Sequence, residues 1–229
     1  MNFLAIDTST EILSLFGSRE GKTFEIVRDI DLHHSEQLIP LVDWVFSQLG
    51  IKPADLDLLV AAGGPGSFTG LRIGLAAVKG ISAGVGCPYV IVSSLDAFAA
   101  RLSALSEKII APVVDAKKQR FYTALWKGTE RITDYLDISP EEFKGLLVGK
   151  EPCILTGPHA YQLKAAIDAD TGVFLDPYSR MGSARMLAQL GLQKYKNEGP
   201  AGDDAGPEYI RKSDAELAVK SGEQDSLRF

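Results

Sequence analysis

Hydrophobic and polar positions in the first hundred residues follow two different periods, which predicts an α/β arrangement. Short apolar runs predict five strands, at 2–6, 12–16, 23–28, 58–62 and 89–92. Apolar residues spaced by three or four positions predict two helices, at 35–50 and 71–83. The resulting order, β-β-β-α-β-α-β, is typical of a mixed sheet with helical crossovers.

The remainder of the chain shows a weaker version of the same pattern. Its predicted strands lie at 109–114, 121–126, 132–138 and 153–156. Its predicted helices run from about residue 140, from 157 to about 167, and over 183–195. A stretch rich in Gly, Asp and Pro at 197–207 precedes a tail that we expect to be mobile after about Leu217. We therefore predict an α/β protein of two similar halves, residues 1–104 and 105–229.

The two predicted helices of the first half differ in their outward faces. At about 100° per residue, Trp44 falls outside the apolar arc of the first helix, which predicts an exposed aromatic side chain that can anchor a partner. The second helix has a bulky face and an opposite face of small residues, Ala76, Ala77, Gly80, Ala83 and Gly84. A helix that is apolar on two sides must be covered on both. The first helix or a partner chain would provide that cover, and the sequence leaves both open.

Composition and charge narrow the class of protein. The 229 residues are 45% hydrophobic and 24% charged, which is ordinary globular usage. The net charge is −6, so we do not expect the chain to bind RNA by itself. Two cysteines are too few for a disulfide framework, and Asp7 follows too short an apolar start for a signal peptide. Because Arg72 and Lys79 interrupt the longest apolar run, we predict no membrane segment and a cytoplasmic protein.

Two polar segments of the first half are candidates for nucleotide chemistry. Asp7-Thr8-Ser9 follows the first strand and offers a carboxylate and two hydroxyls, although the sequence favours a simple turn in which Asp7 accepts backbone N–H bonds. The glycine-rich segment 63–70 precedes a helix, where backbone N–H groups can bind an anion. It lacks the Gly-Lys-Ser/Thr ending of a P-loop, and Ser67 lacks the flanking glycines of a nucleophile elbow.

Metal and phosphate binding have weaker support in the sequence. Neighbouring His33 and His34 cannot point the same way, and neither has a histidine four residues on, so we predict no metal site with them or with His159. A basic cluster beside Asp115 can contact phosphate or form a solvated hairpin, and it comprises Lys117, Lys118 and Arg120.

Several motifs occur together in the order found in one known family. They are Asn2–Ser9, His34-Ser35-Glu36, the specific run Gly-Pro-Gly-Ser-Phe-Thr-Gly-Leu-Arg at 64–72, Asp115-Ala116-Lys117 and Tyr209-Ile210-Arg211. In these motifs the chain resembles the TsaB (YeaZ) family over nearly its whole length. The resemblance implies the actin and sugar-kinase fold, also called ribonuclease H-like, in which two α/β halves flank a cleft.

The resemblance also implies a function in tRNA modification. Family members are non-catalytic subunits that pair with TsaD, and with the ATPase TsaE, to form N6-threonylcarbamoyladenosine at position 37 of tRNAs reading ANN codons. It implies no cofactor on this chain, tRNA contact only through the assembled complex, and a homodimer when the chain is alone. The metal-binding His-x-x-x-His arrangement of the catalytic relative is missing at 33–38.

In the family the first two helices form the dimer contact. We therefore expect an interface that includes Trp44, Ile73, Ala76, Ala77, Gly80 and Ala83. A vestigial nucleotide cleft would comprise Asp7, Thr8, Ser9, Gly64, Gly66 and Asp115. The alternative function is a nucleotide-binding ATPase or small-molecule kinase of the same fold. A chain of 229 residues leaves little room for the adenosine-binding insertions of such enzymes, although weak nucleotide binding remains open.

Overall fold

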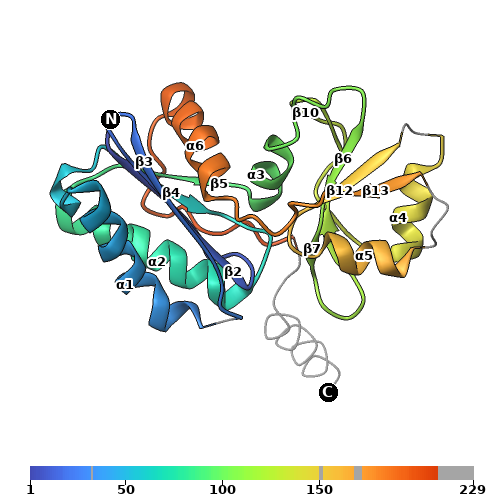
Figure 1. Ribbon diagram of the computed structural model, residues 1–229, viewed down its shortest axis with the longest axis horizontal. Coiled ribbons are helices and arrows are strands. Elements are labelled where there is room, and N and C mark those ends of the chain that lie inside the picture. The colour runs from blue at the N-terminus through green and yellow to red at the C-terminus, as the bar shows by residue number, and fades with distance from the viewer. Residues whose placement is uncertain (32, 150–151, 168–171, 211–229) are drawn as a thin grey trace, which may run out of the picture.

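A computed structural model describes residues 1–31, 33–149, 152–167 and 172–210 of the chain. The predicted mobile tail after Leu217 and Arg211 of the Tyr209-Ile210-Arg211 motif lie outside these described residues. Within them, two five-stranded sheets lie side by side, each with helices packed against it (Figure 1).

The first sheet has the strand order β3-β2-β1-β4-β5. An antiparallel meander of β1 (Phe3–Asp7), β2 (Ile12–Arg19) and β3 (Lys22–Asp29) pairs through β1 with parallel β4 (Leu58–Ala62), and β4 pairs with parallel β5 (Tyr89–Val92). Every residue of β4 is buried, because helices cover both faces of the sheet. This explains why β4 is a continuous apolar run without alternation.

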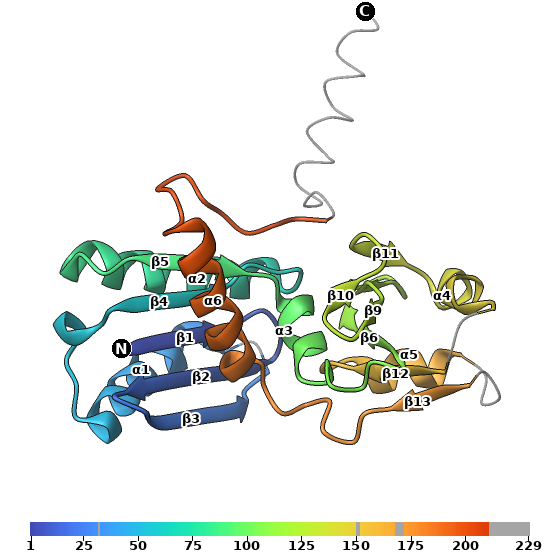
Figure 2. The ribbon, with the colours of Figure 1, turned by 90° about the horizontal axis from the view of Figure 1, so that it is seen from above.

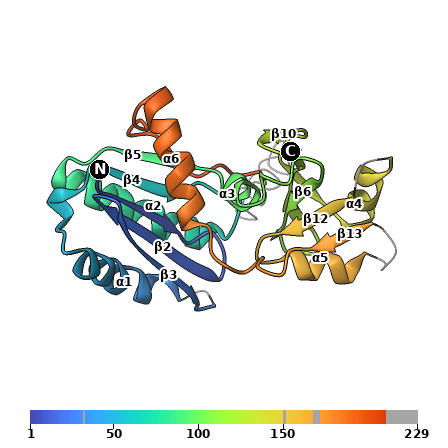
Figure 3. The ribbon, with the colours of Figure 1, turned by 45° about the horizontal axis from the view of Figure 1, so that its top comes forward.

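Three long helices cover the first sheet. One face carries α1 (His34–Leu49), over β2 and β3, and α2 (Phe68–Val85), over β4, while α6 (Ala184–Glu198) crosses the opposite face (Figures 2 and 3). The side chain of Ser67 caps α2 by accepting a hydrogen bond from the N–H of Gly70 at 3.2 Å. The left-handed Gly50, with φ of 63°, ends α1.

The second sheet repeats the topology of the first. Its order is β10-β9-β6-β12-β13, with three antiparallel strands followed by two strands parallel to β6. The strands are β6 (Ile109–Pro112), β9 (Trp126–Lys127), β10 (Glu130–Arg131), β12 (Cys153–Thr156) and β13 (Val173–Leu175). The predicted α/β class with two similar halves is therefore confirmed.

Shorter elements complete both halves, most of them in the second. A three-stranded sheet contains β7 (Val114–Asp115), β8 (Phe121–Thr123) and β11 (Leu136–Ile138). Helices α4 (Pro140–Leu147) and α5 (Ala160–Ala166) bury Phe143 and Leu163 against the second sheet. A short 3-10 helix, Pro53–Asp55, precedes β4.

Two helices connect the halves by packing against the sheet of the other half. Helix α3 (Ser94–Ala100) follows β5 but packs Leu95 and Phe98 against the second sheet, and α6 returns from the second half to the first sheet. The sheets follow the predicted halves 1–104 and 105–229, whereas α3 and α6 do not. The division of the chain into those two units stays a prediction.

Among the described residues, α2 is the helix long and apolar enough to span a membrane by length and composition. Its Leu71, Leu75 and Val78 are buried in the protein core. Arg72 and Lys79 are fastened to the segment 199–210, where Arg72 Nε donates to the Tyr209 hydroxyl at 3.4 Å and Lys79 Nζ to the Asp203 carbonyl at 2.9 Å. One side of α2 is thus packed into the first half of the protein.

Candidate functional site

A stripe of small residues runs along the outward face of α2. Ala76, Gly80 and Ala83 lie on one side of the helix and are exposed. A side chain added at Gly80 would meet nothing within 4 Å. Ile73 and Ala77 lie beside this stripe and are partly buried against the core of the first half. The first helix therefore covers only part of α2, and no described segment covers the small-residue stripe.

An aromatic and cationic cluster, which the sequence did not reveal, lies at the N-terminal end of the stripe. The guanidinium of Arg72 lies 3.8 Å from the centre of the Phe68 ring, and that ring is 5.1 Å from the ring of Tyr209. Phe68 and Arg72 lie one turn apart on α2, but Tyr209 is 137 positions from Arg72, so spacing along the sequence gives no signal for the whole cluster. Phe68 and Tyr209 are both more than one-third exposed, which extends the stripe.

Trp44 lies on a different flank of the helical layer. Its side chain is 49% exposed, as is that of Ile39, another outward residue of α1. The Trp44 ring makes an edge contact with Phe24 of β3, with 5.5 Å between ring centres. Because α1 covers β3 and α2 covers β4, Trp44 is on the side of α1 away from α2. The structure therefore gathers five of the predicted interface residues on α2 and separates Trp44 from them.

The glycine-rich segment packs directly on the turn after β1. A Cβ atom at Gly66 would overlap the carbonyl oxygen of Ser9, and one at Gly70 would overlap that of Thr8. The Ser67 N–H donates to the Ser9 carbonyl at 2.6 Å, and the Thr8 hydroxyl donates to the Gly70 carbonyl at 2.7 Å. The chain's own backbone thus occupies the space that these glycines open. Gly64, with φ of 96°, lies against the backbone of Glu208.

Asp7 is buried and bonded within the protein. It accepts hydrogen bonds from the Ser183 hydroxyl and, at 2.8 Å, from the Ser9 N–H. Burial raises the pKa of the Asp7 carboxyl, and these hydrogen bonds oppose that shift. The bond to Ser183 fastens the start of α6 to the first strand. Gly66 therefore packs on the turn of Asp7, Thr8 and Ser9, whereas Gly64 lies beside Glu208, and the role of these residues in a nucleotide cleft stays a prediction.

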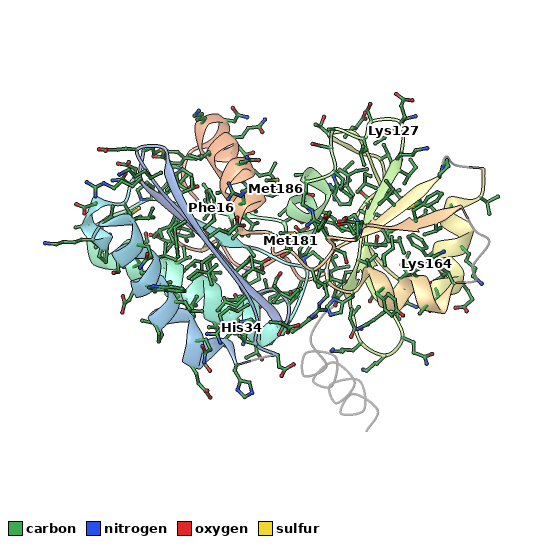
Figure 4. The ribbon with its side chains drawn as sticks, in the orientation of Figure 1. Phe16, His34, Lys127, Lys164, Met181 and Met186 are labelled. Atoms are coloured by element: carbon green, nitrogen blue, oxygen red, sulfur yellow. The ribbon has the colours of Figure 1, made fainter. Side chains whose placement is uncertain are left out.

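The three histidines lie in different environments. His34 is buried, with its Nε2 2.7 Å from the Thr10 carbonyl, and burial lowers its pKa. His33 is exposed, as expected for neighbours that point different ways, and His159 lies in the second half. Figure 4 shows His34 at the start of α1. Within the described ranges, no group of three His, Cys, Asp or Glu residues is placed to hold a metal ion.

Asp115 lies in the second half, and its cavity contains none of the other predicted cleft residues. It pairs with the Lys117 ammonium at 2.9 Å and accepts a hydrogen bond from the Lys117 N–H at 2.7 Å. Arg120 pairs with Asp137 at 2.9 Å and with Glu142 at 3.2 Å. Two cations of the predicted basic cluster are thus already neutralised by neighbouring carboxylates.

An ion cluster joins the two halves beside this region. Glu11, just before β2, binds His159 Nε2 at 3.0 Å and Arg180 Nη1 at 2.9 Å, and Arg180 also pairs with Asp29. Burial favours a higher pKa for Glu11, but its hydrogen bonds and ion pairs with His159 and Arg180 outweigh that effect and lower the pKa to about 2. The ionised carboxylate therefore stabilises the contact between the halves.

This low pKa gives a pH-dependent stability. Because the pKa of Glu11 falls from 4.5 to about 2 on folding, its contribution is complete above pH 4.5 and is lost as the pH falls towards 2. We expect Glu11→Gln to lower the free energy of unfolding by about 2 kcal/mol at neutral pH and to flatten the loss between pH 4.5 and 2. Urea denaturation at pH 7 and at several pH values between 4.5 and 2 measures both effects. Glu107→Gln, at an exposed position, is the control and should follow the wild type; a variant of Glu11 that does so as well would contradict the assignment.

Known proteins resemble this chain both in sequence and in fold. A family model described as TsaD, tRNA N6-adenosine threonylcarbamoyltransferase, matches residues 28–151. TsaB from Bacillus subtilis is 29% identical over 94% of this chain and 96% of its own length, and TsaB from Escherichia coli is 30% identical over 57% of this chain and 60% of its own. The structure of YeaZ from Pseudomonas aeruginosa superposes with a TM-score of 0.77 at 23% identity, covering 91% of this chain and 99% of the other.

The fold and the surface features together define a class of protein. Two sheets of the same order, each an antiparallel meander followed by two parallel strands, form the actin-like, ribonuclease H-like fold, here with an open helical face on the first half. The chain belongs to the tRNA N6-adenosine threonylcarbamoyltransferase family and, within it, to the TsaB (YeaZ) branch.

Proposed function

We propose that this chain is a non-catalytic subunit in the formation of N6-threonylcarbamoyladenosine in tRNA and that it pairs with a TsaD-type transferase. The observation that carries the proposal is the exposed stripe of Ala76, Gly80 and Ala83 on α2. Small residues at this spacing let the backbone of a second helix approach closely, and such an approach buries both helices well. The relatives named for this biosynthesis support the pathway assignment.

The proposal includes two further partners, a second copy of this chain and the ATPase TsaE. A second copy of this chain and the TsaD-type partner would compete for the α2 stripe, so the homodimer is the form of the chain without its partner. The ATPase TsaE would join the assembled pair. Trp44 and Ile39 are exposed apolar residues of α1, and because Trp44 is separated from the α2 stripe, it would anchor a partner that extends across α1.

Access to tRNA through the complex fits the electrostatics. The chain has a net charge of −6, and Lys117 and Arg120 are paired with carboxylates, so little positive field is available for phosphate contacts. We therefore assign recognition of position 37 in tRNAs reading ANN codons to the assembled complex, in the cytoplasm. No cofactor on this chain is part of the proposal.

Reconstituted threonylcarbamoylation of tRNA tests this function. The assay contains a TsaC-type enzyme that makes threonylcarbamoyl-adenylate, TsaD, TsaE, ATP and tRNA, with and without this chain. A second reaction uses Asp7→Asn, which keeps an acceptor oxygen for the Ser9 N–H. We expect activity to require the chain and Asp7→Asn to support it to within about twofold, since the proposal gives Asp7 a structural role.

Two results would contradict the proposal in different ways. Full activity without the chain would remove its role as a subunit. Loss of activity with a folded Asp7→Asn protein would favour the alternative, an ATPase or small-molecule kinase. ATP-dependent stabilisation of the wild type, absent in Asp7→Asn, would then identify the turn as a nucleotide site.

A further inference from the structure

A cavity of about 460 Å³ lies beyond the carboxyl ends of β4 and β5. Gly63 follows β4, Ser93 follows β5, and both line the cavity together with Asp96 of α3 and Lys194 of α6. Tyr135, from the second half, closes one side. The cavity has the size of a small-molecule site and is assembled from both halves of the protein.

The location follows from the sheet topology. The chain leaves β4 for α2 on one face of the sheet and leaves β5 for α3, which packs beside α6 on the other face. Where successive parallel strands send their connections to opposite faces, a crevice opens at their carboxyl ends, and α/β proteins bind ligands there. This crevice is separate from the outward stripe of α2 and from the turn at Asp7.

The segment 199–208 forms the roof of the cavity. The Ala201 N–H donates to the Tyr89 carbonyl at 2.8 Å, and the Glu208 N–H donates to the Gly63 carbonyl at 2.8 Å. Between these bonds, Pro200, Ala205 and Gly206 line the space. The roof is therefore held at both of its ends by the first sheet.

Asp96 is partly buried and has room for a further partner in the cavity. Its Oδ1 accepts a hydrogen bond from the Tyr135 hydroxyl at 2.7 Å, and among the described residues its Oδ2 has no hydrogen-bond partner. Burial raises the pKa of Asp96, while the Tyr135 bond and the charges of Arg131 and Lys194 act against the rise. An added positive charge beside Oδ2 would stabilise the ionised form.

The other charged groups also favour a cation. Three carboxyl groups, those of Asp96, Glu198 and Glu208, line the cavity against one ammonium, that of Lys194. Lys194 already donates to the Ile91 carbonyl at 3.1 Å and lies 3.9 Å from Glu198. The described carboxylates are not grouped closely enough to hold a metal ion. A ligand with several N–H donors spread along its length matches this lining.

We propose that the cavity between β4, β5, α6 and the segment 199–208 binds a small organic amine, of the diamine or polyamine class. One ammonium group of the ligand lies against Oδ2 of Asp96, and a second lies towards Glu198 and Glu208 at the open end. This site goes beyond the proposed subunit function and does not depend on it.

Titration calorimetry of the full chain with spermidine tests the site. We expect one molecule to bind per chain and the affinity to fall at least tenfold in Asp96→Asn, which keeps the Tyr135 bond. Asp115→Asn removes one carboxylate from the other half and serves as the matched control, with affinity within about twofold of the wild type. Ala205→Phe fills the cavity from its roof, leaves every carboxylate in place and should also abolish binding.

The outcomes are distinct. Equal losses in Asp96→Asn and Asp115→Asn would mean that spermidine binds only to the net negative charge, and the proposal would fail. Undiminished binding by a folded Ala205→Phe protein would place the amine outside the cavity and would also overturn it. The same would follow if Mg²⁺ bound with the Asp96 dependence expected of spermidine, because the occupant would then be a metal ion.

Discussion

Replacing Gly70 with alanine should lower the free energy of unfolding by about 3 kcal/mol, although glycine to alanine normally stabilises a helix. A Cβ atom at this position would overlap the carbonyl oxygen of Thr8. That carbonyl belongs to a buried turn which the hydrogen bonds of Asp7 hold in place, so it cannot move cheaply. The penalty is therefore one of backbone overlap and far exceeds the helix propensity gained.

Gly84, on the same helix, provides the matched control. It is exposed, and a Cβ atom there meets nothing within 4 Å. Gly84→Ala should therefore raise the free energy of unfolding by about 0.5 to 1 kcal/mol. Urea denaturation of both variants measures the difference in sign. A stability for Gly70→Ala at or above that of the wild type would disprove the close packing of α2 on the turn.

The second large effect concerns partner binding. Gly80→Leu places a bulky side chain in the middle of the small-residue stripe and would keep a second helix from approaching. We expect affinity for the TsaD-type partner to fall by more than tenfold, which corresponds to about 1.4 kcal/mol. The fold itself should be unaffected, because the added atoms point into open space.

A leucine introduced on a different helix tests whether the loss of partner binding depends on the α2 stripe or on any added surface leucine. Gly145 lies on α4, is exposed and also has nothing within 4 Å of an added Cβ atom. Calorimetric titration of the partner into Gly145→Leu should give the wild-type affinity. If Gly80→Leu, shown to be folded by circular dichroism, also bound like the wild type, the α2 stripe would not be the interface.

The sequence predicted the strands that helices cover on both faces of the first sheet. The predicted strands 58–62 and 89–92 coincide with β4 and β5, because each is a short apolar run with polar or glycine residues at its ends. The predicted strand 121–126 instead divides into β8 and β9, which pair in different sheets. That division depends on partners elsewhere in the chain and leaves no periodic signal.

Helix α3 shows another limit of pattern analysis. It has seven residues, and its apolar side chains face two cores: Ala97 packs with the first sheet, whereas Leu95 and Phe98 pack with the second. A helix buried on several sides has no polar face, so its amphipathic period is missing. The sequence did not predict the cavity at Asp96 for the same reason. In addition, Asp96 and its partner Tyr135 are 39 residues apart, so no local motif contains both.

The outward stripe of α2 was predictable because a long, half-buried helix keeps a regular period. The ion cluster at Glu11 was not, since its contact with Arg180 joins residues 169 positions apart. Contacts of this kind depend on how the two halves meet. They also include the bond from Ser183 to Asp7, which no local motif indicates.

The return of α6 to the first sheet determines the order in which this protein can mature on the ribosome. The strands of that sheet are synthesised by residue 92, but the helix that covers its second face begins at residue 184. Until α6 emerges, apolar side chains such as Phe16, Val60 and Val90 on that face have no cover. The nascent first half therefore presents an apolar sheet surface to chaperones while residues 93–183 are synthesised, and its core closes only near the end of synthesis.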